Sequence, residues 1–85
     1  MIMTARKKIH IQYFAMLREK RGLSDESIET LAETASDLYE ELRRRFHFPL
    51  TIDKVKVGVN EELTDWNCLL KHNDRVVFIP PVSGG

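Results

Sequence analysis

The chain has 85 residues, of which 42% are hydrophobic and 31% are charged, a composition typical of one small globular domain and not of a disordered segment. Thirteen basic and thirteen acidic residues give no net positive field that would hold nucleic acid. Because no apolar run could span a membrane and the N-terminus lacks a signal-peptide core, we expect a cytoplasmic protein that binds neither nucleic acid nor a membrane.

The first predicted strand runs from Lys8 to Tyr13, because apolar and polar residues alternate there. Residues 1–7 show no such periodicity and are expected to form a flexible N-terminal extension. Phe14 follows on the polar side of the strand, where a large apolar side chain would lie outside the core. The next predicted elements are an irregular segment at 15–21, a turn at 22–26 and a second strand at 27–31 that forms a hairpin with the first.

The main predicted helix begins after Thr34, which can cap it together with Asp37 in a variant of the capping box. Thr30 with Glu33 is a rival cap, ranked second because the preceding residues have an extended pattern. Pro49 prevents the helix from continuing. The apolar residues that fall on one stripe of this helix are Ala35, Leu38, Tyr39, Leu42 and Phe46.

The basic run 43–45 lies in the last turn of this helix, where cations favour the helix C-terminus. Glu40 with Arg44 and Glu41 with Arg45 are spaced as i,i+4 pairs. The run is therefore explained as a solvated helix end without a ligand.

The second half of the chain predicts three more strands. In chain order, these elements are a strand at 55–59, a turn at 60–61, a short strand at 62–64, a helical turn or irregular cover at 66–70, a turn at 72–74 with Asn73 in a left-handed conformation, and a last strand at 75–79. The fold class is therefore α+β, with a four- to five-stranded sheet and one main helix on one face.

The last strand is apolar on both sides, although one helix can cover only one face of such a sheet. One pair, Val76 and Phe78 or Val77 and Ile79, can pack under the helix, and the other must face the uncovered side. Phe14 should lie on that side as well. We expect an open apolar patch on which a partner docks, unless loops cover these side chains.

No catalytic or metal site is evident within the chain. Cys68 cannot form an internal disulfide, which favours a reducing compartment, and it has no patterned histidine beside it. The three histidines, His10, His47 and His72, lack the spacing of metal ligands. We therefore expect no metal and no permanently bound cofactor.

The plausible reactive group is the α-carboxylate of Gly85, which follows Gly84 at the end of a tail stiffened by Pro80 and Pro81. Two glycines without side chains can pass through a narrow channel into the active site of another protein. A carboxylate must first be activated, for instance as an acyl-adenylate made from ATP by a separate enzyme, and a sulfur nucleophile can then displace AMP. The alternative is a flexible tail without function.

Three stretches resemble a known family: Tyr-Phe-Ala-Met-Leu-Arg-Glu at 13–19, Val-Asn at 59–60 and Val-Phe-Ile-Pro-Pro-Val-Ser-Gly-Gly at 77–85. They are similar to the small subunit of molybdopterin synthase, the MoaD-type sulfur carrier, over about residues 8–85. The resemblance implies a ubiquitin-like β-grasp domain at 8–80 with a tail at 81–85, and assigns no role to residues 1–7. Asn73 stands where a glycine is common.

The resemblance also implies a mechanism in which the carrier is not an enzyme by itself. A MoeB-type, E1-like enzyme adenylates the C-terminus with ATP, a sulfur donor converts it to a thiocarboxylate, and the sulfur passes to cyclic pyranopterin monophosphate. The tail inserts into a MoaE-type large subunit, in a heterotetramer of two small and two large subunits. By position, the reactive tail is Gly84 and Gly85, the residues that line its path are Pro80, Pro81, Val82 and Ser83, and the apolar contacts with the large subunit are Phe14, Leu63 and Ile79.

Two other functions use the same C-terminal diglycine. One is a sulfur carrier for the thiazole of thiamin, and the double proline and the 13–19 segment favour the molybdopterin branch over it. The other is a ubiquitin-like modifier that forms isopeptide bonds with lysine. A plain interaction domain with an inert C-terminus is a further alternative.

Overall fold

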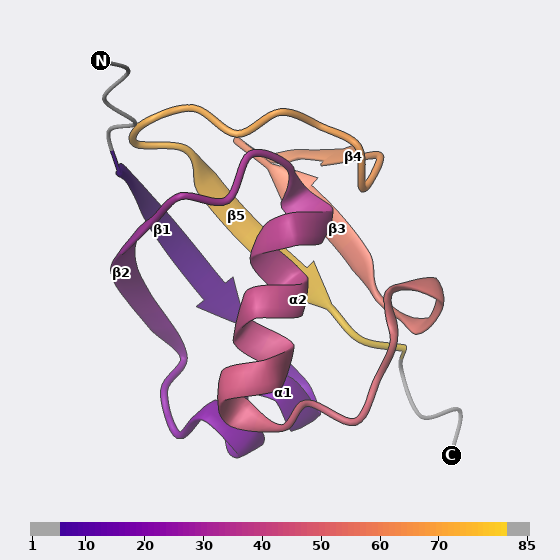
Figure 1. The fold of residues 1–85 in the computed structure, drawn as a ribbon. Coiled ribbons are helices and arrows are strands. Elements are labelled where there is room, and N and C mark those ends of the chain that lie inside the picture. The colour runs from indigo at the N-terminus through magenta and orange to yellow at the C-terminus, as the bar shows by residue number, and fades with distance from the viewer. Residues whose placement is uncertain (1–5, 82–85) are drawn as a thin grey trace.

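The computed structural model describes residues 6–81, which form one curved sheet with a helix packed along one face (Figure 1). The elements are β1 (Lys7–Tyr13), α1 (Ala15–Arg21), β2 (Asp25–Thr30), α2 (Ala35–Phe46), the 3-10 helix η1 (Ile52–Lys54), β3 (Lys56–Val59), β4 (Glu62–Thr64) and β5 (Arg75–Ile79). Residues 1–5 and 82–85, which make up most of the expected extension (1–7) and most of the expected tail (81–85), lie outside the described residues.

The five strands lie in the order β2-β1-β5-β3-β4. β1 and β5 run parallel, and the other neighbouring pairs are antiparallel. The last strand of the chain thus lies at the centre of the sheet, between the first strand and the third. This mixed sheet with its covering helix confirms the predicted α+β class.

The hydrophobic core lies between α2 and the sheet. Alternate residues of the central strands point into it, so Val76 and Phe78 are buried, as one of the two predicted arrangements required. The ring of Tyr39 on α2 lies 5.2 Å from that of Phe78, and Trp66 stacks on Phe78 at 6.0 Å with an interplanar angle of 11°. Trp66 therefore covers the core from the β4–β5 connection.

The predicted cap of α2 is confirmed. The Thr34 hydroxyl accepts a hydrogen bond from the Asp37 amide at 3.1 Å, and the Asp37 carboxylate accepts one from the Thr34 amide at 3.2 Å. The rival cap is wrong, because Thr30 ends β2 and its hydroxyl donates to Glu41 at 2.7 Å.

Of the two predicted charge pairs on α2, one forms. Arg45 and Glu41 are 4.0 Å apart, whereas Glu40 pairs with Arg43 at 3.5 Å instead of with Arg44. An i,i+3 partner is as close on a helix as an i,i+4 partner, so spacing alone does not choose between them.

The expectation of an irregular segment after β1 is wrong. Residues 15–21 form α1, which ends at Gly22, a residue in the left-handed conformation (φ 84°) whose amide donates to the Arg18 carbonyl at 2.8 Å. Leu17 is the buried residue of this helix. Two helical turns are too short to show a period, and it is contact with the core that places Leu17 inside.

The strand boundaries differ slightly from the predicted ones. β1 begins at Lys7, and β2 spans Asp25–Thr30, starting two residues earlier and ending one residue earlier than expected. The predicted antiparallel pairing of these strands is correct, but α1 and the short loop after it connect them, instead of a tight turn.

The turns of the second half agree with the predictions. Asn60 and Glu61 have φ of 52° and 74°, and Asn73 has φ of 72°, so these residues adopt left-handed conformations. Residues 66–70 form an irregular cover, anchored to the start of α2 by a bridge between Thr34 and Leu69. The turn η1 was not predicted.

Candidate functional site

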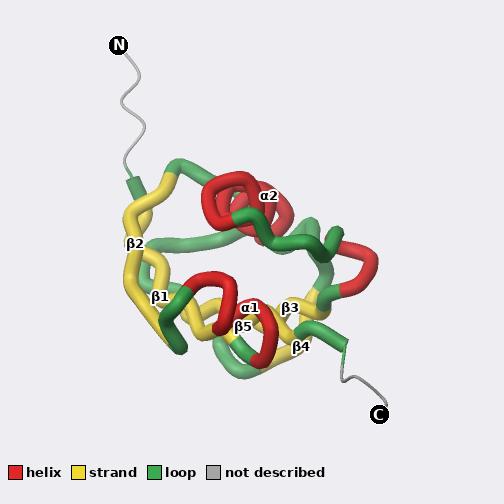
Figure 2. Tube along the Cα trace, turned by 90° about the horizontal axis from the view of Figure 1, so that it is seen from below, coloured by secondary structure: helices red, strands yellow, loops and turns green. Residues whose placement is uncertain are grey.

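The sheet face turned away from α2 carries the exposed apolar residues that the sequence placed there. Figure 2 shows α2 on one side of the strands. Phe14 is 39% exposed and Ile79 is 37% exposed, whereas Phe78 is fully buried on the opposite face. Of the two pairs that the sequence left open, Val77 and Ile79 are the one that faces the uncovered side, since both line the groove described next.

Phe14 and Ile79 come together because β1 and β5 are parallel neighbours. Tyr13 is paired with Phe78, and the residue after each of them lies on the open face. Both side chains line a groove of about 690 Å³ that also includes Val77. Large apolar groups at the same end of two central strands form a surface suited to contact with another protein.

Leu63 lies on the same face but not in this groove. Gly58 of β3 is paired with Val77 on one side and with Leu63 on the other, so these three residues form one row across the sheet. A Cβ atom at Gly58 would lie 2.9 Å from Val77 Cγ1, so the Val77 side chain occupies space that is open only because residue 58 is glycine. Leu63 is 67% exposed and lines a separate hollow of about 400 Å³ at the edge of the sheet.

The described chain leaves the sheet at Pro80, which is buried, and Pro81, which is exposed. Both follow Ile79 directly, so the chain departs beside the apolar end of the groove. Val82, Ser83, Gly84 and Gly85 lie outside the described residues, and their predicted roles stay predictions, as do the path-lining roles of the two prolines.

The other half of the groove is polar. His10, Asp25, Ser27, Glu61 and Arg75 line it, and His10 Nδ1 lies 2.7 Å from Ser27 Oγ. Sequence reasoning did not single out Arg75. The alternation of the strand could have placed it on the open face, because Arg75 lies two residues before Val77 and alternate residues of a strand share a face.

A partly buried charge network supports the strand end that precedes Phe14. Arg21 donates two hydrogen bonds of 2.7 Å to the Glu26 carboxylate, which also accepts one of 2.8 Å from the Tyr13 hydroxyl. These bonds, with the Arg21 bonds foremost, lower the pKa of Glu26 despite its partial burial. Burial, reinforced by Glu26, raises the pKa of the Tyr13 hydroxyl far above its usual range.

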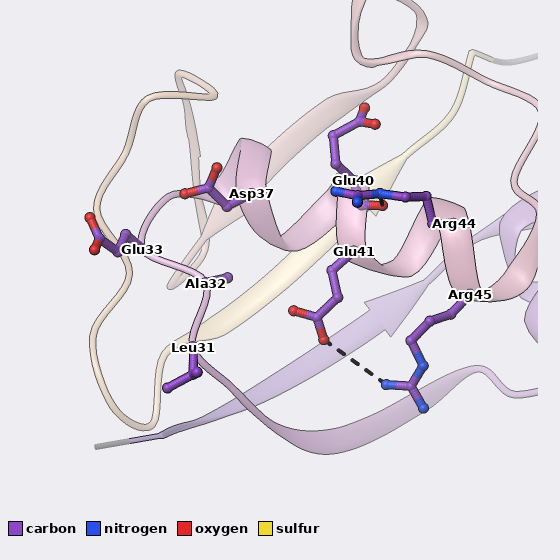
Figure 3. A pocket seen from close by; sticks show the side chains of 8 residues that line it. All are labelled: Leu31, Ala32, Glu33, Asp37, Glu40, Glu41, Arg44 and Arg45. Atoms are coloured by element: carbon purple, nitrogen blue, oxygen red, sulfur yellow. Dashed lines mark hydrogen bonds and ion pairs between the residues drawn. The ribbon is translucent and has the colours of Figure 1, made fainter. Parts of the chain in front are cut away.

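A second hollow of about 690 Å³ lies against α2, and six of its eight lining residues are charged. Figure 3 shows its carboxylates and guanidiniums interleaved, with Glu41 beside Arg45. Arg44 Nε donates to the carbonyl of Glu40 at 3.3 Å. Opposite charges that are held this close offer little net attraction for a ligand.

Within residues 6–81, no three His, Cys, Asp or Glu side chains are grouped as metal ligands. Cys68 is partly exposed, and its Sγ lies 3.6 Å from the Leu69 carbonyl. None of the helices in the described part of the chain has the length and apolarity needed to cross a membrane.

Comparison with known proteins assigns the fold and the family. The molybdopterin synthase sulfur carrier subunit of Drosophila yakuba is 33% identical over 81 residues, which cover 91% of this chain and 90% of that protein. The crystal structure of SAMP1 from Haloferax volcanii superimposes with a TM-score of 0.75 at 23% identity, over 92% of this chain and 99% of that one. The fold is thus the predicted ubiquitin-like β-grasp, here with a second short helix, α1.

One solved relative is seen with a partner. A complex of subunits 1 and 2 of the molybdopterin-converting factor from Helicobacter pylori contains a chain that matches with a TM-score of 0.64 at 23% identity, over 92% of this chain and 99% of that one. A sequence model described as the ThiS family matches residues 11–85, which include the end of β1, all of β5, the groove residues other than His10, and the terminal glycines. The chain belongs to the ThiS family.

Proposed function

We propose that the chain is the sulfur-carrier subunit of a molybdopterin synthase, with the C-terminal carboxylate of Gly85 as the group that carries sulfur. The observation with most weight is the family match, which runs through to Gly85, together with a molybdopterin synthase sulfur carrier of 33% identity that aligns over 90% of its own length. This relative favours the molybdopterin branch over the thiamin branch of the same family.

The chemistry begins with an acyl activation. The Gly85 carboxylate attacks the α-phosphorus of ATP on a MoeB-type enzyme, which gives the acyl-adenylate and releases pyrophosphate. A hydrosulfide-level sulfur nucleophile then forms a C–S bond at the acyl carbon, the C–O bond to AMP breaks, and a thiocarboxylate remains. ATP is thus consumed by the activating enzyme and is not a resident cofactor of the carrier.

Delivery of the sulfur needs a second protein. In the active site of a MoaE-type large subunit, the thiocarboxylate sulfur forms a C–S bond to cyclic pyranopterin monophosphate. Water then cleaves the acyl C–S bond, which leaves the sulfur on the pterin and restores the Gly85 carboxylate, and two such transfers supply the two dithiolene sulfurs. We propose a heterotetramer of two small and two large subunits, because each transfer uses one carrier. In this proposal the small subunit contributes no catalytic side chain.

The open face is proposed as the docking surface for the large subunit. Phe14, Val77 and Ile79 form its apolar end, beside the point where Pro80 and Pro81 lead the chain away from the sheet. Docking there would remove apolar area from water at about 25 cal/mol per Å² and would aim the following residues at the partner. Leu63 would contact the partner at the rim of the same face.

Intact-mass measurement tests the carrier function. The purified chain is incubated with the activating enzyme, ATP and sulfide, and the expected product has one oxygen exchanged for sulfur at Gly85. A variant without Gly85 is the control and should stay unmodified. The proposal is wrong if the full chain never acquires sulfur, and lysine conjugates that depend on Gly85 would instead indicate a protein modifier.

Transfer is measured separately. The thiocarboxylated chain is mixed with the large subunit and cyclic pyranopterin monophosphate, and the dithiolene product is followed by mass spectrometry. Loss of the thiocarboxylate without pterin sulfuration would contradict the molybdopterin assignment and point to another sulfur acceptor.

A further inference from the structure

The backbone of Arg75 is hydrogen-bonded on both its amide and its carbonyl at the start of the middle strand. It begins β5, the middle strand, where it is in register with His10 of β1. On the other side, its amide donates to Asn60 Oδ1 at 3.0 Å and its carbonyl accepts from the Asn60 amide at 2.8 Å. These hydrogen bonds fix the position of the Arg75 Cα atom relative to Val77 and Ile79, whose side chains point to the same face as that of Arg75.

The guanidinium of Arg75 has no carboxylate partner among residues 6–81. The residue is exposed and lines the groove, yet it takes part in no ion pair of the described chain. By contrast, Arg21 binds Glu26, Arg43 binds Glu40 and Arg45 binds Glu41. Arg18 and Arg44 on the helices also form no ion pair within residues 6–81, so what sets Arg75 apart is its position in the groove beside Val77 and Ile79.

Three carboxylates line the same groove. Glu26 is already paired with Arg21, and the positions of Asp25 and Glu61 limit their attraction for the Arg75 guanidinium. Asp25 is on the edge strand β2, separated from β5 by β1, so two strand spacings of about 4.8 Å lie between their backbones. Glu61 is in the β3–β4 turn and forms no ion pair with Arg75. For Asp25, two strand spacings exceed the Debye length of about 8 Å, so solvent screens most of its attraction for Arg75.

Docking of an apolar surface on Phe14, Val77 and Ile79 would bring the partner over Arg75 as well, because all four line one groove. Removing a guanidinium from water costs free energy if it gains no hydrogen-bond acceptor in return. A carboxylate of the partner can accept two parallel hydrogen bonds from it and offset that cost. We propose that Arg75 is a specificity-determining residue of this face, which accepts a partner that presents a carboxylate beside its apolar contact surface. The inference rests on the proposed function, in which that partner is the large subunit.

Binding measurements with charge variants test this. We would measure the Kd of the chain for the large subunit of the same organism by calorimetry, at low and high salt. Arg75→Glu should weaken binding at least about tenfold, and Arg75→Gln should weaken it less. Arg44→Glu is the matched control, because Arg44 is an exposed arginine on α2, away from the open face, and it should leave the Kd within twofold. Thermal unfolding followed by circular dichroism verifies that each variant is folded.

A charge-reversal pair gives the decisive result. Replacing the partner carboxylate by lysine should restore the affinity of Arg75→Glu while weakening that of the unmodified chain. The inference is overturned if Arg75→Glu binds like the unmodified chain while Phe14→Asp does not bind. Failure of the proposed function is distinguishable, since it appears as absence of the Gly85 thiocarboxylate, a modification measured without the large subunit.

Discussion

The Asn60 side-chain amide donates to Asp74 Oδ1 at 2.9 Å, so the β3–β4 turn is fastened to the start of β5. Asp74 is nearly buried, and its other oxygen accepts from the Lys71 amide at 2.7 Å. Asn60 also accepts from the Arg75 amide at 3.0 Å. One left-handed turn residue thereby sets the position of the strand that leads to the tail.

Replacing Asn60 tests this connection. Asn60→Ala should lower the free energy of unfolding by about 1–3 kcal/mol, because it leaves Asp74 with an unpaired buried oxygen and puts alanine at φ 52°. Asn60→Gly tolerates that φ but lacks the same hydrogen bonds, so it should still be less stable than the unmodified chain in urea unfolding. Equal stability of Asn60→Gly would show that the hydrogen bonds contribute nothing.

Glu26 should make stability depend on pH. Its pKa is lowered in the folded state, chiefly by the hydrogen bonds from Arg21. The stabilisation is therefore present at neutral pH, above the pKa of the unfolded state, and is lost as the pH falls through the lower folded value. Glu26→Gln should cost about 1.5–3 kcal/mol at pH 7.

The difference between Glu26→Gln and the unmodified chain should shrink as the pH falls below about 4.5, and chemical unfolding at several pH values measures it. Tyr13→Phe serves as the control, because it removes one hydrogen bond but keeps the Arg21–Glu26 pair. A Glu26→Gln deficit that stays constant down to pH 3 would contradict the assignment.

The capping box of α2 predicts a moderate loss of stability when Thr34 is replaced. Thr34→Ala removes the hydroxyl that accepts from the Asp37 amide and should cost about 1 kcal/mol. Ser36→Ala lies two residues further into the helix and should be neutral or slightly stabilising, since alanine favours helices. Thermal unfolding distinguishes the two, and equal melting temperatures would argue against the cap.

Leu17 tests the packing of α1. Its side chain is fully buried, so Leu17→Ala should cost about 2–5 kcal/mol through lost transfer energy and a cavity. Leu23 follows α1 and is 41% exposed, and Leu23→Ala should change stability by less than about 0.5 kcal/mol. Similar losses at both positions would mean that α1 does not pack on the core as described.

Phe14 tests the docking surface. Phe14→Asp should weaken binding of the large subunit at least about tenfold, because it places a charge where an apolar contact is proposed. It should leave stability nearly unchanged, since the ring is already exposed. Leu69→Asp, at a residue 68% exposed near the start of α2, is the control and should bind normally. Normal binding by Phe14→Asp would exclude the open face as the contact surface.

Local patterns in the sequence were enough to predict the strands and the main helix. Alternation placed Ile9, Ile11 and Tyr13 in the core, and all three are buried. The Thr34–Asp37 spacing located the start of α2 because a capping box is made within one helical turn. The same alternation left Phe14 and one side of the last strand exposed, which predicted the open face.

Tertiary structure decided what local pattern could not. Residues 15–21 become a helix through the burial of Leu17, and Leu63 lies outside the groove because β3 separates its strand from β5. Phe14, Arg75 and Ile79 line one groove only because the first and last strands are parallel neighbours. Alternation within a strand follows from backbone geometry and can be read residue by residue. Which strands become neighbours depends on burying the whole core at once, so it emerges only when the chain folds.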